Sequence, residues 1–215
     1  MPKSKSEIST THIGGSAMSG GGRNPQSEIE FTSGSVEETQ AFGERLGQAL
    51  RAGDVVALFG ELGSGKTTLI QGLAKGLGRD PDTIKSPTFV LMREYPPGPS
   101  VTGAGAGGEV PLVHIDGYRL EGAPAVAWLD VELIFSPHKI TVIEWAERFG
   151  DLLPEDCFQI HLSHISTNRR RIKLVSSSPR GQEVFSQLQA TTTAETTDQT
   201  GAPPTGQQAK PAQPA

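Results

Sequence analysis

The sequence has little cysteine, no long apolar run and no excess of positive charge. The single cysteine, Cys157, leaves no partner for an intrachain disulfide, and because no motif surrounds it we expect a buried structural residue. No stretch approaches the ~18–20 apolar residues of a membrane span, and the N-terminus lacks the apolar core of a secretory signal. We therefore expect a cytoplasmic protein without a membrane segment.

The charge balance argues against a protein that binds nucleic acid directly. The net charge is −5. The segment 1–27 carries +2 and the segment 191–215 carries −1, which leaves −6 for residues 28–190. A protein that grips a phosphate backbone alone shows a basic excess. Any action on nucleic acid is therefore expected to pass through a partner.

Both ends of the chain are poor in large apolar side chains. Residues 1–27 are mostly Ser, Gly and Thr, and residues 191–215 are mostly Thr, Gln, Ala and Pro. Such segments bury too little apolar surface to offset the entropy lost on ordering. We predict two disordered tails around one domain, residues 28–190. Within it, the Gly/Pro-rich stretch 96–109 is predicted to be a surface loop.

Strand patterns and helix patterns alternate through the central region. Strands are predicted at 28–33, 54–60, 88–95, 110–116, 139–145, 158–165 and 170–177, and helices after Ser35, after the glycine-rich loop, at 122–135 and at 180–190. Continuous apolar runs such as DVVALFG are typical of strands buried on both faces. Alternating apolar residues in 158–165 and 170–177 predict a closing antiparallel pair. The fold class is therefore α/β with a mainly parallel sheet.

The strongest functional motif is a phosphate-binding loop. GELGSGKT, from Gly60 to Thr67, fits G-x-x-x-x-G-K-[ST] without a mismatch, between a buried strand and an apolar helix. Its glycines let several backbone N–H groups converge on phosphates, aided by the positive end of the helix dipole. Lys66 is expected to reach the β- and γ-phosphates, and the Thr67 hydroxyl is expected to bind Mg²⁺. The layout predicts a three-layer P-loop NTPase-like fold.

Two carboxylates follow apolar strands at the end where ligands bind in open α/β sheets. Asp116 ends VPLVHID, and Glu144 lies in TVIEW. Ligands bind beyond the carboxyl ends of such strands, so both acids are expected to face the nucleotide. One acid is needed near Mg²⁺ and one group must orient the attacking water. The residues alone leave open which acid does which, and we favour Asp116 for the water.

Other polar residues have a structural and a functional interpretation that the sequence leaves open. His114 shares a strand face with Asp116 and can be a hydrogen-bonded buried histidine or a group that orients the site. Ser86-Pro87-Thr88 is a turn placed where switch loops of related NTPases contact the γ-phosphate side. Trp145 can be a core residue or a surface anchor. Arg169–Arg171 can be a solvated edge or a partner contact.

Three alternative functions share the loop. A small-molecule or nucleoside kinase usually has an arginine-bearing lid, but the Gly-rich stretch 96–109 contains neither Arg nor Lys. A GTPase usually shows D-x-x-G and [NT]-K-x-D signatures, and neither is present within residues 28–190, which favours ATP. A nucleotide-dependent binding module without hydrolysis remains open until Asp116 or Glu144 is substituted.

The ordered set GELGSGKTT, SPTF, HIDGYRL and IEWAER resembles the TsaE (YjeE) family, over roughly residues 30–175. The combination is far more specific than the loop alone. The resemblance implies a P-loop ATPase in formation of N6-threonylcarbamoyladenosine on tRNA. It also implies TsaB and TsaD as partners, contact with tRNA only through that complex, and an ATP cycle that supports the transfer without performing it.

The resemblance also implies site residues. The expected catalytic residues are Lys66, Asp116 and Glu144, and the expected metal ligands are Thr67 and Glu144. Contacts with ATP are expected from Glu61, Leu62, Gly63, Ser64, Gly65, Lys66, Thr67, Thr68, Thr88 and Trp145. Tyr118 and Arg119 match the motif without a defined role.

Overall fold

The computed structural model describes residues 8–11, 27–98, 109–120 and 130–197 of the 215-residue chain. Its strands are β1 Ile8–Thr11, β2 Ser27–Ser33, β3 Val55–Phe59, β4 Met92–Tyr95, β5 Leu112–Asp116, β6 Ile140–Glu144, β7 Phe158–His164 and β8 Arg170–Ser176. Its α-helices are α1 Val36–Ala49, α2 Lys66–Gly76, α4 Val131–Ile134 and α5 Pro179–Thr197. Short 3₁₀ turns are η1 Pro81–Thr83, η2 Gly117–Arg119, η3 Ala146–Arg148 and η4 Gly150–Leu152.

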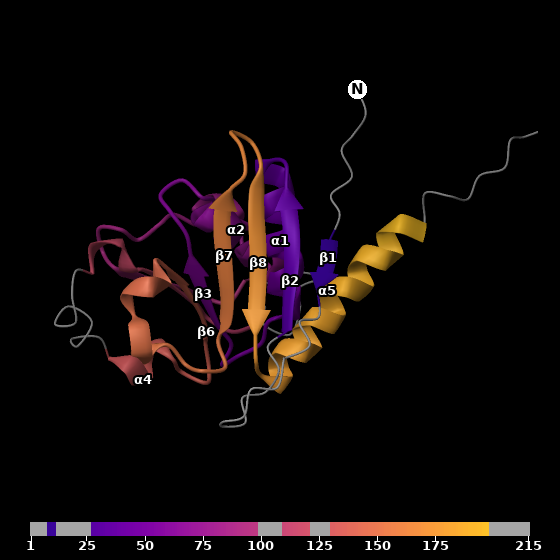
Figure 1. Cartoon of the computed structure of the whole chain (residues 1–215). Coiled ribbons are helices and arrows are strands. Elements are labelled where there is room, and N and C mark those ends of the chain that lie inside the picture. Colours follow the sequence, from indigo (N-terminus) through magenta and orange to yellow (C-terminus); the bar gives the residue numbers. More distant parts are fainter. Residues whose placement is uncertain (1–7, 12–26, 99–108, 121–129, 198–215) are drawn as a thin grey trace, which may run out of the picture.

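The strands form one sheet in the order β1-β2-β8-β7-β3-β6-β5-β4 (Figure 1). The neighbours β7, β3, β6 and β5 run parallel, and the strands outside them pair antiparallel at both edges. The predicted α/β class is confirmed, and so is the closing antiparallel pair β7–β8. β3 lies at the centre, so its carboxyl end opens between the ends of β6 and β7.

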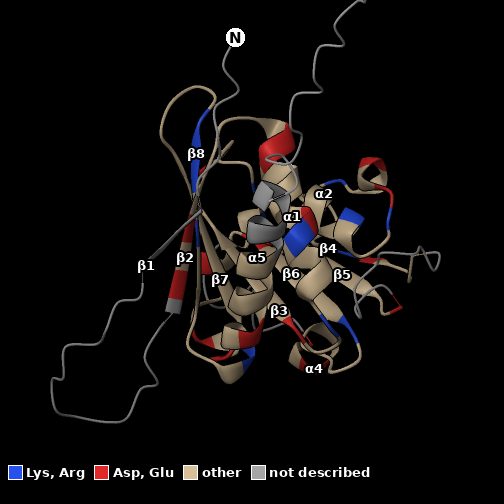
Figure 2. Cartoon of the chain, turned by 90° about the vertical axis from the view of Figure 1, so that its right-hand side faces the viewer, with Lys and Arg blue, Asp and Glu red and all other residues tan. Residues whose placement is uncertain are grey.

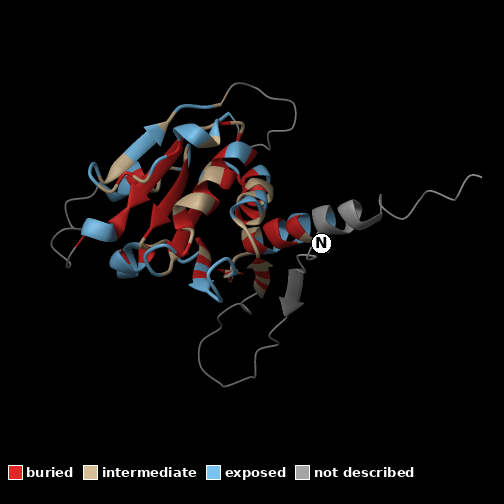
Figure 3. Ribbon diagram, turned by 90° about the horizontal axis from the view of Figure 1, so that it is seen from above, coloured by how far each residue is buried: buried red, intermediate tan, exposed pale blue. Residues whose placement is uncertain are grey.

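Apolar side chains form a core on each face of the sheet. Leu46 of α1, Leu73 of α2 and Val184 of α5 belong to the larger cluster. The smaller cluster, on the opposite face, includes Ile134 of α4 and Phe149 beside η3. Figure 3 shows the buried residues concentrated in the sheet and on the helix faces that meet it. The layers therefore hold β3, β5 and β6 between two apolar surfaces, as their continuous apolar runs predict.

Helices α1 and α2 touch through glycine. A Cβ atom added at Gly72 would lie 2.1 Å from the carbonyl oxygen of Gln40, and one added at Gly43 would lie 2.3 Å from the carbonyl oxygen of Leu69. Gly47 and Gly76 make equally close backbone approaches. No other residue type fits such contacts. This contact fixes the N-terminus of α1 beside the N-terminus of α2.

A reciprocal capping arrangement sets the start of α1. The Ser35 hydroxyl accepts from the Glu38 N–H at 3.2 Å, and the Glu38 carboxylate accepts from the Gly34 N–H at 2.7 Å. These bonds satisfy backbone donors that a helix start leaves free. The helix expected after Ser35 is confirmed, and Ser35 is its N-cap.

The strand predicted at 88–95 was wrong in its first half. Residues 87–91 form a turn in which the N–H groups of Val90 and Leu91 donate to the Pro87 carbonyl at 2.9 and 2.7 Å. Leu91 has a φ of 67°, a left-handed conformation that a strand does not contain. The apolar residues in this stretch give a sequence pattern like that of a strand, but β4 begins only at Met92.

Several other boundaries differ from the expectations. Ile8–Thr11 forms β1 and pairs with β2, although 1–27 was expected to be a disordered tail. The last helix extends to Thr197, beyond the expected domain boundary at 190. Only Val131–Ile134 of the helix predicted at 122–135 is described as α4, and 121–129 lies outside the described residues.

The ends of the predicted 96–109 loop are joined by Arg79. Its guanidinium donates to the Pro96 carbonyl at 3.1 Å and to the Val110 carbonyl, and a third bond reaches the Leu77 carbonyl at 3.1 Å. Arg79 is buried. Residues 99–108 lie outside the described residues. Arg79 therefore holds Pro96 and Val110, at the two ends of this segment, close to each other.

Candidate functional site

The loop between β3 and α2 has the backbone shape that its glycines allow. Gly60, Gly63 and Gly65 have positive φ values of 144°, 77° and 104°. A Cβ atom at Gly60 would lie 2.4 Å from the Leu162 carbonyl oxygen of β7. The glycine at 60 is therefore required by both conformation and space. The result is a loop that wraps the N-terminal end of α2, where backbone N–H groups and the helix dipole favour an anion.

Lys66 lies inside this loop. Its Nζ donates to the carbonyls of Gly60 at 2.7 Å and Glu61 at 3.0 Å, and it lies 3.9 Å from the centre of the Trp145 ring. Lys66 is only 4% exposed. Burial lowers the pKa of its ammonium group, and the charges of three nearby carboxylates oppose that effect. Lys66 is therefore a buried cation whose hydrogen-bond acceptors are the neutral carbonyl oxygens of Gly60 and Glu61.

Glu144 connects the loop helix to the sheet. Thr67 Oγ1 donates to both carboxylate oxygens of Glu144, at 2.9 and 3.0 Å. His114 Nε2 lies 3.0 Å from Glu144 Oε1. Glu144 is 3% exposed and ends β6. A hydroxyl and a carboxylate thus converge from α2 and β6 at one point beside Lys66.

Asp116 lies next to Glu144 in the sheet and belongs to a separate hydrogen-bond group. The two residues are register partners on the parallel strands β5 and β6. Asp116 Oδ2 accepts from the hydroxyls of Ser86 and Thr88, and Oδ1 accepts from the Tyr118 N–H at 2.9 Å. The turn at 86–91 is therefore tied to the sheet through this carboxylate.

Trp145 follows Glu144 in a left-handed conformation, with φ 57°. This backbone setting is unusual for an aromatic residue and turns its ring back over Lys66. The Tyr118 ring packs against it with ring centres 5.1 Å apart. Strained backbone of this kind clusters at binding sites. The Trp145 and Tyr118 rings thus form one wall of the site.

One pocket collects almost all of the residues predicted from the sequence. This carboxylate pocket has a volume of about 400 Å³ and is lined by Leu62, Gly63, Ser64, Gly65, Lys66, Thr67, Thr68, Ser86, Thr88, Asp116, Tyr118, Glu144 and Trp145. Of the expected contacts, only Glu61 is not part of the lining. Its side chain is exposed and its carbonyl accepts from Lys66.

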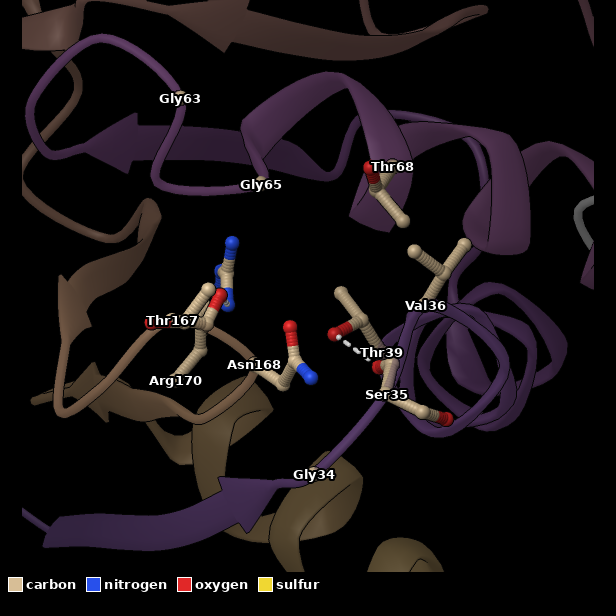
Figure 4. Close-up of a pocket in the computed structure, with 10 residues that line it drawn as sticks. All are labelled: Gly34, Ser35, Val36, Thr39, Gly63, Gly65, Thr68, Thr167, Asn168 and Arg170. Carbon is tan, nitrogen blue, oxygen red and sulfur yellow. Dashed lines mark hydrogen bonds between the residues drawn. The ribbon is translucent and has the colours of Figure 1, made fainter.

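A second pocket borders the same loop (Figure 4). This hairpin pocket has a volume of about 280 Å³ and is lined by Gly34, Ser35, Val36, Thr39, Gly63, Gly65, Thr68, Thr167, Asn168 and Arg170. Val36 and Thr39 enter from α1, Asn168 points into the pocket from the β7–β8 connection, and Arg170 points from the start of β8 toward the glycines of the loop. Gly63, Gly65 and Thr68 border both pockets. One elongated ligand can therefore occupy both.

Sequence reasoning missed the hairpin pocket. Ser35 and Val36 precede the loop by about thirty positions, and Arg170 follows it by about a hundred, so no local motif joins them. The run Arg169–Arg171 was the one available signal. The structure divides it: Arg170 lines the pocket, whereas Arg171 pairs with Glu30 of β2 at 3.0 Å. Figure 2 shows acidic residues on β2 and basic residues on β8.

The donor set suits a triphosphate with a hard divalent cation. Thr67 and Glu144 offer only oxygen, the ligand type that Mg²⁺ prefers. Within the described ranges, no group of three or more His, Cys, Asp and Glu residues is arranged to hold a metal. Mg²⁺ in phosphate sites usually takes one or two carboxylates plus phosphates and water. The hydroxyl of the loop residue Ser64 is buried without a hydrogen-bond partner among the described residues, so it is a further donor within the loop.

A glycine loop of this shape, between a buried parallel strand and a helix that starts with Lys-Thr, defines a P-loop-type protein. The family model for the threonylcarbamoyl adenosine biosynthesis protein TsaE matches residues 33–172. The chain belongs to the TsaE family.

Individual relatives agree with this assignment. The chain is 42% identical to the tRNA threonylcarbamoyladenosine biosynthesis protein TsaE of Streptomyces coelicolor over 56% of this chain and 75% of that protein. It is 30% identical to the TsaE protein of Bacillus subtilis over 75% of this chain and 94% of the relative. The crystal structure of Bacillus subtilis YdiB matches with a TM-score of 0.62 at 26% identity, covering 78% of this chain and 97% of that one.

In the part of the chain that the structure describes, no helix has both the length and the apolar character needed to cross a membrane.

Proposed function

We propose that this protein binds ATP with Mg²⁺ and hydrolyses it as a component of the tRNA N6-threonylcarbamoyladenosine machinery, together with TsaB and TsaD homologues. The observation that carries the proposal is the contact of Thr67 with Glu144 beside the buried cation Lys66. Asp116 lies one strand away, in register with Glu144. These are the components that phosphoryl transfer to water requires. Membership of the TsaE family supports the pathway.

The two pockets suggest how ATP lies across the loop. The phosphates occupy the loop and the carboxylate pocket, where Lys66 exchanges the carbonyls of Gly60 and Glu61 for phosphate oxygens. The nucleoside occupies the hairpin pocket, with the Val36 side chain as an apolar surface and the Asn168 amide as a hydrogen-bonding group. Arg170 points toward the loop from the same side and adds a cation near the phosphates.

The two acids have different surroundings and therefore different proposed roles. Glu144, bonded to the Thr67 hydroxyl, holds Mg²⁺ together with that hydroxyl. The cation, when bound, neutralises charge on the phosphates. Asp116 orients the attacking water and accepts its proton, since it is tied to Ser86 and Thr88 of the turn that faces the γ-phosphate. Trp145 and Tyr118 exclude bulk water from one side.

The partner proposal is supported by exposed apolar side chains near the carboxylate pocket. Leu62, which lines the pocket, is 76% exposed, and Phe89 and Val90, which follow the lining residue Thr88 in the chain, are 85% and 61% exposed. Exposed large apolar side chains beside a site are typical of protein contacts. The net charge of −6 on residues 28–190 argues against direct binding of tRNA, so contact with tRNA is proposed to be indirect. A surface of this kind at the mouth of the site lets a partner control hydrolysis.

The test separates binding from turnover. Asp116→Asn is expected to abolish hydrolysis while ATP affinity persists, and Glu144→Gln is expected to weaken the Mg²⁺-dependent part of the affinity as well. Both are measured as phosphate release and as calorimetric ATP binding with and without Mg²⁺. Unchanged turnover in both variants would favour a pure binding role. Phosphoryl transfer to a small acceptor, with no response to TsaB and TsaD, would favour a kinase.

A further inference from the structure

His114 occupies a position that the core would fill with an apolar residue. It lies in the middle of β5, two residues before Asp116, and is 0% exposed. Its strand neighbours on the same face are Leu112 and Asp116 on β5, its register partner Val142 on β6, and its exposed register partner Arg93 on β4. Leu112, Asp116 and Val142 are buried. A polar ring in such surroundings costs free energy unless its hydrogen bonds are made. Packing alone therefore does not explain a histidine here.

Among the described residues, the one hydrogen-bond partner of the His114 ring is Glu144. Its Nε2 lies 3.0 Å from Glu144 Oε1, whereas its Nδ1 is buried without a hydrogen-bond partner among the described residues. An ionised carboxylate accepts hydrogen bonds and cannot donate them, so Nε2 carries the proton at this contact. One ring nitrogen is thus left unsatisfied while the other contacts the acid.

The strand geometry explains why residue 114 can reach this acid. On neighbouring parallel strands, His114 is level with Val142, and Glu144 lies two residues further on the same face. The diagonal distance between positions 114 and 144 can be spanned by long side chains such as those of His and Glu. Glu144 then receives the ring N–H from the β5 side and the Thr67 hydroxyl from the α2 side. With donors on two sides, its carboxylate has one preferred orientation.

We propose that His114 is a positioning residue, which holds the Glu144 carboxylate in the orientation needed to bind the divalent cation with Thr67. The inference rests on the proposed function, because it assigns His114 a role toward the cation of that same site. Groups that hydrogen-bond metal ligands typically change metal affinity by about 10–100-fold when removed. His114 therefore acts on the cation through Glu144 and does not touch the nucleotide.

The test compares variants that keep or remove the N–H donor at this distance. His114→Gln retains an amide N–H of similar reach, His114→Asn has the amide on a shorter side chain, and His114→Leu has no donor. Val113→Ala is the matched control, because Val113 is the neighbouring buried residue on the opposite face of β5. Affinity for Mn²⁺ in the presence of ATP is measured by electron paramagnetic resonance, and ATP affinity is measured separately in EDTA.

The expected result is a loss of Mn²⁺ affinity of about tenfold or more in His114→Leu and His114→Asn, with ATP affinity in EDTA unchanged. His114→Gln should keep an affinity close to wild type, as should Val113→Ala. If His114→Leu does not fold, the Gln and Asn pair decides the question. Wild-type Mn²⁺ affinity in every folded variant would overturn the positioning role. A wild-type protein whose ATP complex takes up no Mn²⁺ would instead overturn the proposed function and this inference with it.

Discussion

Replacing Gly72 with alanine tests the contact that places α1 beside the loop. The added Cβ would lie 2.1 Å from the Gln40 carbonyl oxygen and 2.7 Å from its carbonyl carbon. Both neighbours are backbone atoms of a helix, so no side chain can move aside. Ordinary contacts of a Cβ are 3.4–4 Å. To bring this contact back to an ordinary distance, the two helices must separate by more than about 1 Å.

Two opposing effects set the size of the change. Alanine is favoured over glycine within a helix by about 1 kcal/mol. Overpacking a close contact costs about 1–3 kcal/mol and occasionally more. Because rigid backbone forms the whole of this contact, we expect overpacking to dominate, with a net loss of about 2 kcal/mol in the free energy of unfolding. Separation of the helices also moves Val36 and Thr39, so ATP affinity should fall.

Urea unfolding followed by circular dichroism measures the stability, and calorimetry measures the ATP affinity. Gly34→Ala is the control, because its Cβ would meet only the Glu38 side chain, at 3.5 Å or more. Its unfolding free energy should stay within about 1 kcal/mol of wild type. A Gly72→Ala protein as stable as wild type, or more stable, would show that helix propensity dominates and would refute the close contact.

Three further predictions concern other parts of the structure. Arg180→Leu leaves Asp54, which is 7% exposed, without its ion pair, and should lower the free energy of unfolding by about 3–5 kcal/mol. The control Glu183→Ala removes an exposed pair with Arg180 and should lower it by less than about 1 kcal/mol. Burial, with the charge of Asp156, raises the pKa of the Cys157 thiol from 9.0 to about 11; native protein should therefore react slowly with a thiol reagent at pH 8, and stability should fall as pH rises from about 9 toward 11, because the unfolded thiol ionises first. Rapid labelling without unfolding would contradict that burial. Arg170→Ala should weaken ATP binding by about 1.5–3 kcal/mol, while its exposed neighbour Arg169, replaced by alanine, should have little effect; equal effects would remove Arg170 from the site.

The residues predicted from the sequence lie together in the carboxylate pocket because their positions are set by local rules. The loop motif fixes the position of Lys66 and Thr67 at a helix start, and the apolar runs place Asp116 and Glu144 at the ends of parallel strands. Those strands turned out to be neighbours in register. The rule that ligands bind at the carboxyl ends of strands predicted that both acids face the site, and there Glu144 accepts from the Thr67 hydroxyl.

The remaining features depend on contacts between distant segments. The turn at 87–91 is apolar enough to imitate a strand, and the bonds from Ser86 and Thr88 to Asp116 that accompany it span about thirty residues. The hairpin pocket joins α1 to the β7–β8 connection across more than a hundred residues. The glycines of α1 and α2 were visible in the sequence, but nothing local indicated that they face one another. Long-range pairing of this kind has no signature in a single sequence.

The central claim is that the loop and its two acids make an ATPase that responds to TsaB and TsaD. The most direct measurement is phosphate release by the purified protein, alone and with both partners, for wild type and Lys66→Ala. We predict stimulation by the pair in the wild type and none in the variant, because Lys66 is the buried cation of the phosphate loop. Stimulation that survives in Lys66→Ala, or a wild type that releases no phosphate with the partners present, would contradict the account.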